Sequence, residues 1–391
     1  MQPLIESLFA LLLATPDTQG GQAEPSSGAP ASVQAKGRSA PSSARAKDAL
    51  SPTTRTLLEH SSEEAWQRAL EALAPHKVFP LLDYRLAEHG LLQHVPAAAR
   101  DALKKVHDDV RARNGLLLLT LARILRMAAA RGESVLLLKG ILFADSYYPD
   151  FSTRPMSDID LVAVRGRDEA LFKLLGEAGF RPSLHHTVQE HSITFMNREG
   201  VFCDAHRTLP MFVGEPWHRI RRDVELQRVH GVKVMALEPN AMVAHLVAHM
   251  HGHTPDLGFV LLWIVDLAFV LRRVGDELDV RRIRKLIGSE GAWVLLLRLV
   301  RLLQSVGEPL PAALAHVSRA LPQLTLGAAL RQRRITPWGL PAPLGWVRLL
   351  AHQLGLHHSE RPLPCPADLV LWPLDELTQR VAPPLARAFL R

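Results

Sequence analysis

Residues 136–164, LLLKGILFADSYYPDFSTRPMSDIDLVAV, constrain the fold more than any other part of the chain. A short apolar run ends in Lys139-Gly140, and a second apolar run opens with Asp158-Ile159-Asp160. In a β-strand, residues i and i+2 project to the same side, so the two carboxylates lie side by side where the strand begins. Carboxylates this close repel each other, and burying them is costly unless a positive charge meets them. The pattern therefore predicts a strand that begins at a cation site.

The residues around this pair predict that the cation binds together with the phosphate chain of a ligand. Gly140 opens a helix directly after a strand, which leaves backbone N–H groups available to an anion. Lys139 precedes this glycine, and Arg154 lies shortly before Asp158. Ser157 either caps a turn or contacts phosphate. Mg²⁺ takes one or two carboxylates and fills its other positions with water and substrate phosphates, so the pattern is typical of a site for a metal-bound triphosphate.

A third carboxylate, Asp204, stands inside the apolar segment VFCDAHRTL, which we expect to be the second strand of a hairpin. Two-metal phosphoryl transfer needs one ion on the leaving phosphates and one on the attacking oxygen. Asp158 and Asp160 would bridge two Mg²⁺ ions, while Asp204 would hold the second ion and accept the proton of the acceptor hydroxyl. His206 shares the side of Asp204 and would orient that carboxylate or the substrate.

These motifs together resemble the nucleotidyltransferase superfamily with the DNA polymerase β-like palm, and in particular its bacterial branch called uncharacterised nucleotidyltransferase family five. The residues that carry the resemblance are Lys139-Gly140, Arg154, Ser157-Asp158-Ile159-Asp160-Leu161 and Asp204-Ala205-His206. The resemblance extends from about Trp66 to Leu271. It implies Mg²⁺ and transfer of a nucleoside monophosphate from an NTP, such as ATP, to a hydroxyl. In that superfamily serine or glycine follows the motif glycine, whereas Ile141 follows it here.

The expected fold is α+β, with a small mixed nucleotidyltransferase sheet of about four to six strands between two helical regions. Residues 1–55 should be a mostly flexible arm, because residues 16–55 are rich in Gly, Ala, Ser, Pro and Gln and nearly lack large apolar side chains. Residues 56–132 form the N-terminal helical region, 133–237 the catalytic core and 238–391 the C-terminal helical region. The periodicity predicts strands at Val135–Leu138, Ile159–Val164, Ser192–Asn197, Val201–His206, Val224–Val229 and Val232–Met235, and helices at Pro96–Arg131, Gly140–Tyr147 and Arg167–Ala178.

Composition limits the partners and the compartment. The net charge of +7 favours anionic partners such as phosphates. Two cysteines, Cys203 and Cys365, cannot build a disulfide framework or a cysteine-based zinc site, so we expect a cytoplasmic protein. The longest apolar run, Phe259–Leu271, is interrupted by Asp266 and is shorter than the roughly twenty residues of a membrane span. We therefore expect no membrane segment.

A second cluster of potential ligands lies in HLVAHMHGHTPD. His245 and His249 are four residues apart on one helix face, a spacing that zinc sites use, and His251 and His253 follow. No glutamate stands between the first two, so the metalloprotease pattern is absent. We expect His245 and His249 to pack in the core or to line the acceptor cleft, with a zinc hydrolase as the alternative.

The basic clusters leave RNA open as an acceptor, since arginines can hold a phosphate backbone. They lie at Arg219–Arg222, Arg281–Lys285 and Arg331–Arg334. No aromatic residues interleave with them for base stacking, which favours a small molecule or a protein as the acceptor. An RNA-directed transferase, and a catalytically inactive palm that acts as a binding scaffold, are the alternatives.

Overall fold

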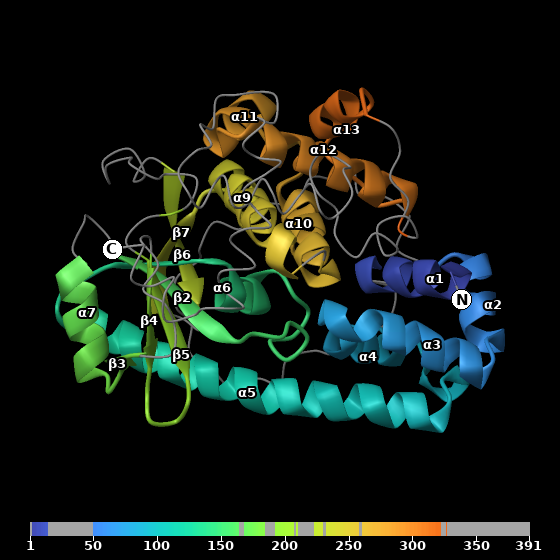
Figure 1. Ribbon diagram of the computed structural model, residues 1–391, viewed down its shortest axis with the longest axis horizontal. Helices are drawn as coiled ribbons and strands as arrows, with labels where there is room; N and C mark the ends of the chain where they lie inside the picture. Colours follow the sequence, from blue (N-terminus) through green and yellow to red (C-terminus); the bar gives the residue numbers. More distant parts are fainter. Residues whose placement is uncertain are drawn as a thin grey trace, which may run out of the picture.

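The computed structural model (Figure 1) describes residues 2–14, 50–163, 168–183, 192–206, 209, 223–229, 232–257, 260–321 and 326. Several expectations fall outside these residues. They concern the arm at 15–49, Cys365, and the arginine clusters at 219–222 and 331–334.

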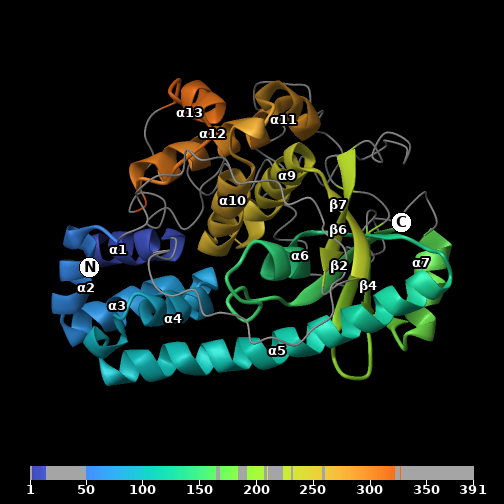
Figure 2. The ribbon, with the colours of Figure 1, turned by 180° about the vertical axis from the view of Figure 1, so that it is seen from behind.

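The N-terminal helical region consists of α1 (Gln2–Leu13), α2 (Pro52–His60), α3 (Glu63–Leu73), α4 (Phe79–Glu88) and the long α5 (Ala97–Ala130). Ser62 caps α3, because its hydroxyl accepts a hydrogen bond from the N–H of Ala65 at 3.3 Å. Helix α5 lies within one residue of the predicted Pro96–Arg131 at each end. It runs along α3 and α4 at one end and reaches the sheet at the other (Figures 1 and 2).

Helix α1 differs from the mostly flexible arm that the composition predicts for residues 1–55. Leu8, Phe9, Leu11 and Leu12 on this helix are fully buried. The helix packs against α2, α3, α4 and α10 (Leu261–Val274). Burying these side chains offsets the conformational entropy that is lost when the helix becomes ordered. The composition of the segment does not show that such buried contacts with other helices are available.

Seven strands form one mixed sheet in the order β3-β4-β5-β2-β1-β7-β6. They are β1 (Val135–Leu137), β2 (Asp158–Ala163), β3 (Arg181–Pro182), β4 (Ser192–Met196), β5 (Phe202–His206), β6 (Val224–Val229) and β7 (Val232–Leu237). Six of them match the predicted strands. The seventh, β3, has two exposed residues without alternating apolar side chains, so the sequence pattern carries no signal for it. The expected count of about four to six strands was therefore too low.

The central strands β2 and β5 are parallel, while β1 pairs antiparallel to β2 and parallel to β7. Helices α5 and α7 (Asp168–Glu177) both contact β2. The inner side chains of β2, Ile159, Leu161 and Ala163, are buried. Because residues alternate along a strand, Asp158 and Asp160 project to the opposite face of the sheet.

The C-terminal helices gather on the far side of the sheet from α5 (Figures 1 and 2). In addition to α10 they are α9 (Pro239–Leu257), α11 (Val280–Ile287), α12 (Glu290–Ser305) and α13 (Ala312–Ser318). Among the helices of the described ranges, none has the length and hydropathy that crossing a membrane would require. The observed fold is thus α+β, with a mixed sheet between two helical regions.

Candidate active site

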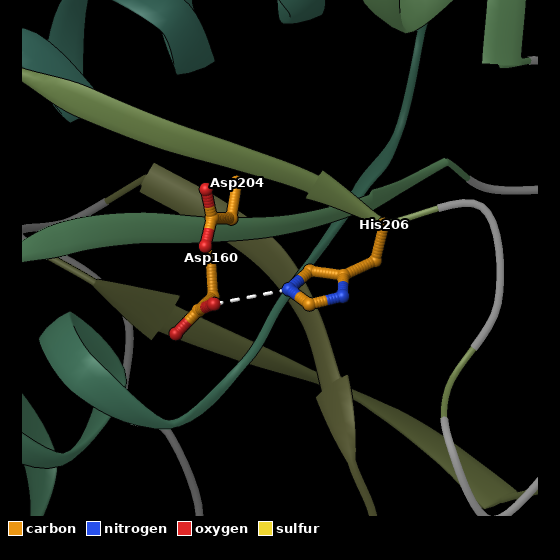
Figure 3. A group of neighbouring side chains, drawn as sticks. All are labelled: Asp160, Asp204 and His206. Atoms are coloured by element: carbon orange, nitrogen blue, oxygen red, sulfur yellow. Dashed lines mark hydrogen bonds and ion pairs between the residues drawn. The ribbon is translucent and has the colours of Figure 1, made fainter. Parts of the chain in front are cut away.

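Strand pairing brings the predicted carboxylates together. In the parallel pair of β2 and β5, Asp160 lies opposite Asp204 and Val162 lies opposite His206. Neighbouring strands are about 4.8 Å apart, so paired side chains on one face are in contact range. Figure 3 shows Asp160 and Asp204 on adjacent strands, with the ring of His206 turned toward Asp160.

Asp160, Asp204 and His206 form a group that could hold a metal ion, because one ligand atom from each lies within 4.8 Å of the others. His206 Nε2 donates to Asp160 Oδ1 at 3.0 Å, and Thr194 on β4 donates its hydroxyl to Asp204 Oδ1 at 2.7 Å. The carboxylate oxygens of Asp160 and Asp204 are hard ligands that fit Mg²⁺, whereas an imidazole such as that of His206 suits ions such as Zn²⁺. Asp158 lies outside this group, whereas His206, which the sequence places beside the site, lies inside it.

Lys139 is the positive partner that the buried carboxylates require. Its Nζ lies 3.2 Å from Asp160 Oδ2, and both side chains are largely buried. The preceding residue, Leu138, donates its N–H to the carbonyl of Asp160 at 3.2 Å, which joins the end of β1 to β2. Lys139 begins α6 (Lys139–Ser146), and Gly140 adopts a left-handed φ of 33° there. This conformation turns the chain from strand into helix beside Asp160, and it favours glycine.

The two carboxylates of β2 differ in their ionisation. Burial and the neighbouring charge of Asp160 raise the pKa of Asp158 to about 6. Burial also acts to raise the pKa of Asp160, but Lys139 and the hydrogen bond from His206 outweigh it and hold that pKa well below its ordinary value. Asp160 is therefore the permanent anion of the site, and Asp158 changes charge near neutral pH.

Arg154 makes its direct contacts with Asp266 and lies within electrostatic reach of Asp160. Its Nε and Nη2 donate to the two carboxylate oxygens of Asp266 on α10, at 2.8 and 2.7 Å, and the arginine is 5% exposed. This contact occupies the Nε–Nη2 edge, one of the two edges of the guanidinium that can form a two-point contact with a carboxylate or a phosphate. A buried carboxylate on a distant helix thus neutralises the charge of Arg154, and the nucleotide-binding role that the sequence predicts for it stays a prediction.

Ser157 is exposed and lies next to the carboxylates. A hydrogen bond from its side chain to Asp158 acts to lower the pKa of that acid, against the larger effect of burial. The carbonyl of Ser157 accepts from Arg113 Nη2 of α5 at 3.1 Å. Ser157 thus combines an ordered backbone with a hydroxyl beside the site.

His245 and His249 lie on α9 within electrostatic reach of Lys139 and Asp160. Burial, followed by the charge of Lys139, lowers the pKa of His245 to about 3 and that of His249 well below its ordinary value. The two rings stack with centroids 6.3 Å apart, and His249 meets the ring of Trp263 edge-on at 5.5 Å. Within the described ranges, the α9 histidines form no group of three metal-ligating side chains. His245 and His249 are neutral imidazoles packed beside the site.

A family model described as uncharacterised nucleotidyltransferase matches residues 62–306. The chain belongs to this family. The matched region begins in α3 and ends just beyond α12, so it contains the sheet, the carboxylates and helices from both flanking regions. Family and fold together support a nucleotidyl transfer activity.

Two solved structures are similar to this chain, with low sequence identities and low TM-scores. The solution structure of the antibiotic-resistance factor ANT(2'')-Ia is 14% identical, covering 44% of this chain and 90% of that one, with a TM-score of 0.35. An antigenic nucleotidyltransferase-like protein from Paracoccidioides brasiliensis is also 14% identical, covering 52% and 96%, with a TM-score of 0.34. No curated protein matches the chain.

Two residues that form hydrogen bonds with the predicted site residues were not predicted from the sequence. Thr194, which holds Asp204, occupies an ordinary position in a β-strand and gives no local signal. Asp266, which holds Arg154, is an acid within the apolar run LLWIVDLAFVL, and a buried charge in such a run must have a partner. This acid is therefore the signal from which a buried partner could have been expected, although the run does not show which residue it is.

Proposed function

We propose that this protein is a Mg²⁺-dependent nucleotidyltransferase that moves a nucleoside monophosphate from an NTP to a hydroxyl of a small molecule or protein. The observation that carries the proposal is the pairing of Asp160 with Asp204 across two parallel strands, beside His206 and Lys139. Membership in the nucleotidyltransferase family supports the same reaction class.

Each side chain has a role in this proposal. Asp160 and Asp204 hold the metal, with Asp158 beside them and His206 orienting Asp160 through the hydrogen bond between them. Bound Mg²⁺ supplies the positive charge that neutralises the phosphates and the attacking oxygen.

The remaining roles concern the proton and the phosphates. Asp204, held by Thr194, accepts the proton of the acceptor hydroxyl. Lys139, Ser157 and the backbone at Gly140 lie where the phosphates would bind, and these contacts position the NTP. His245 and His249 form an uncharged wall beside the site.

A protein or small-molecule acceptor is favoured over RNA. The basic cluster on α11 is partly neutralised, because Arg282 pairs with Asp223 at 2.5 Å and with Glu238 at 3.3 Å. Arg284 lies 3.3 Å from Glu290. Arginines paired in this way release fewer counterions from a nucleic acid, so they contribute less to its binding.

A labelling experiment tests this proposal. The protein is incubated with Mg²⁺, each α-labelled NTP in turn and a lysate of its host, and the labelled product is treated with RNase. We expect one acceptor class to carry label that resists RNase and is absent with Asp204→Asn. Asp108→Asn, which removes an exposed acid of α5, is the control and should label like the wild type.

The other outcomes identify the alternatives. RNase-sensitive label that is lost with Asp204→Asn would identify an RNA-directed transferase. Absence of label, together with calorimetry that detects no Mg²⁺-dependent NTP binding, would identify a catalytically inactive scaffold. Stoichiometric zinc in the purified protein would instead favour a hydrolase at the α9 histidines.

A further inference from the structure

Arg154 lies where four elements meet. It belongs to the segment between α6 and β2, and its guanidinium forms the two-point contact with Asp266 of α10. Its guanidinium carbon lies 5.6 Å from the centre of the Phe143 ring on α6. Its carbonyl accepts from Asn114 Nδ2 of α5 at 2.8 Å. Tyr148 completes the contact by donating its hydroxyl to Asp266 Oδ1 at 2.7 Å. One residue therefore connects α5, α6 and α10 to the strand that carries the carboxylates.

The rest of the segment 147–157 is held from the side of α5. His107 Nε2 lies 2.8 Å from the hydroxyl oxygen of Ser152, and Arg113 donates to the carbonyl of Ser157. These contacts come from one helix, so α5 alone fixes one side of the segment. On the other side α10 holds the segment, through Asp266, through the contact of Tyr148 with the ring of Phe269 at 4.9 Å and through Arg273, whose guanidinium carbon lies 4.8 Å from the centre of the Tyr147 ring.

Stability alone does not explain a buried ion pair at this position. Asp266 is 1% exposed and Arg154 is 5% exposed, so both charges are removed from water. Apolar side chains of similar volume often stabilise a fold at least as well as a buried ion pair does. The ion pair differs from apolar packing in its direction, because a planar guanidinium meets a carboxylate in one geometry. Such a contact sets position as well as contributing to packing.

We propose that Arg154 and Asp266 are positioning residues, which hold the carboxylates of β2 in register with Lys139 on α6. This inference rests on the proposed function, and it deepens it by assigning Arg154 to geometry instead of phosphate binding. Asp158 lies four residues after Arg154 along the chain, and Lys139 lies four residues before Phe143 on α6. A shift of Arg154 would therefore change both sides of the site together.

The deciding variant replaces the ion pair by apolar side chains of similar volume, Arg154→Met with Asp266→Leu. We expect it to melt cooperatively, below the wild type only by the cost of the hydrogen bond that Tyr148 loses, because no buried charge is left unpaired. We expect its affinity for Mn²⁺, measured by electron paramagnetic resonance, to fall about tenfold. Its kcat should fall about 10- to 100-fold, as is usual when a partner that orients metal ligands is lost, while KM for NTP stays within about threefold.

The same helix offers a matched control. Arg272 of α10 forms a similar two-point contact with Glu308, at 2.7 and 2.6 Å from Nη2, and Glu308 is 8% exposed. Arg272 also donates to the carbonyl of Leu13 at the end of α1, and Glu308 follows α12, so this pair joins α10 to elements that carry none of the carboxylates. Arg272→Met with Glu308→Leu should leave both Mn²⁺ affinity and kcat unchanged.

The single variant Asp266→Asn separates positioning from phosphate binding. Positioning requires Asp266→Asn to weaken Mn²⁺ binding and kcat in the same direction as the double variant. If Arg154 binds phosphate, Asp266→Asn leaves Mn²⁺ affinity intact, and only variants of Arg154 raise KM for NTP. That second result would overturn the inference.

Other outcomes with the double variant would also decide whether the ion pair positions the site. A double variant with unchanged Mn²⁺ affinity and kcat would make the pair a packing contact, and a double variant without a cooperative melt would make it a folding requirement. Either result overturns the positioning role.

A wild type that binds Mn²⁺ but labels no acceptor would refute the proposed function, while the Mn²⁺ affinities would still decide the role of Arg154. A wild type that does not bind Mn²⁺ would overturn both.

Discussion

At the scale of single residues, Asp158 and Asp160 occupy one strand but differ in charge. Lys139 and His206 both contact Asp160, and they keep its pKa well below the ordinary value in spite of burial. Burial and the charge of Asp160 raise the pKa of Asp158 to about 6. The metal-free site therefore stores repulsion at Asp158, which a divalent cation would relieve.

This repulsion predicts a stability that depends on pH. A carboxyl with a raised pKa in the folded protein contributes to the free energy of unfolding below about pH 4, and the contribution is lost as the pH rises through about 6. In buffer with a chelator, Asp158→Asn should therefore be more stable than the wild type at pH 8, by on the order of 2 kcal/mol. Thermal melts should show this difference vanishing near pH 4. An equal difference at both pH values would show that the charge of Asp158 is not the cause.

The carboxylates that hold the metal should be needed for activity and dispensable for folding. Asp160→Asn keeps the shape of the side chain and its hydrogen bond but removes the permanent anion of the site. We expect a fall in kcat of about 100- to 1,000-fold, the size of losing a charged contact to the transition state. Circular dichroism should match the wild type. Retained activity, or an unfolded variant, would contradict the assignment of Asp160.

Lys139 should compete with the metal for Asp160. Its ammonium lies 3.2 Å from the carboxylate, so a bound cation must share or displace this contact. Lys139→Met should raise Mg²⁺ affinity by up to about tenfold and weaken NTP binding by a similar factor, since each tenfold corresponds to about 1.4 kcal/mol. Calorimetry measures both constants. Lys104→Met, at an exposed pair with Asp108, is the control. Unaltered NTP affinity would assign Lys139 to charge balance alone.

At the scale of elements, the turn from β1 into α6 depends on one backbone conformation. Gly140 has a φ of +33°, and a Cβ built there would meet no heavy atom within 4 Å. A substitution is therefore strained by the backbone alone, and not by crowding. The same turn aims Lys139 at β2, so the conformation of one residue serves the geometry of the site.

Gly140→Ala should lower the free energy of unfolding by about 1–3 kcal/mol, the cost of placing an ordinary residue in a sparsely populated backbone conformation with positive φ. Gly115→Ala is the matched control, because Gly115 lies inside α5 with equal space and ordinary helical φ. It should stabilise the protein by about 0.5–1 kcal/mol. Denaturant titration measures both changes. Equal effects of the two substitutions would show that the turn carries no strain.

At the scale of the whole molecule, α1 connects the N-terminal helical region to α10. Arg272 of α10 donates to the carbonyl of Leu13 at the end of α1, which adds a polar contact to the apolar packing. Because α10 also carries Asp266, the N-terminal helices and the carboxylate site share one helix as a support.

Leu8 of α1 is fully buried, so Leu8→Ala should lower the free energy of unfolding by about 2–5 kcal/mol. Leu119→Ala, at a residue of α5 that is 73% exposed, should change it by less than about 0.5 kcal/mol. The comparison by thermal melts tests whether α1 belongs to the folded core. A negligible effect of Leu8→Ala would return this segment to the flexible arm that its composition predicts.

The sequence by itself determined the elements and the chemistry that they could carry. The strands around Asp160 and Asp204, the long helix α5 and the glycine turn at Gly140 all follow from patterns that span a few residues, since side-chain alternation and helical periodicity are local properties. The order of a Lys-Gly turn, an acid pair and a later acid was also visible in the chain, and it indicated a metal and a phosphate.

Only the tertiary structure decided which of these side chains meet. Arg154 lies only four residues before Asp158, yet its guanidinium contacts Asp266, which is 112 positions further along the chain. His206 reaches Asp160 because β5 pairs parallel with β2 in one register, and α1 is ordered because α10 and α4 cover it. Each of these outcomes depends on the free energy of contacts between distant segments, and no local pattern encodes which distant segment will supply the partner.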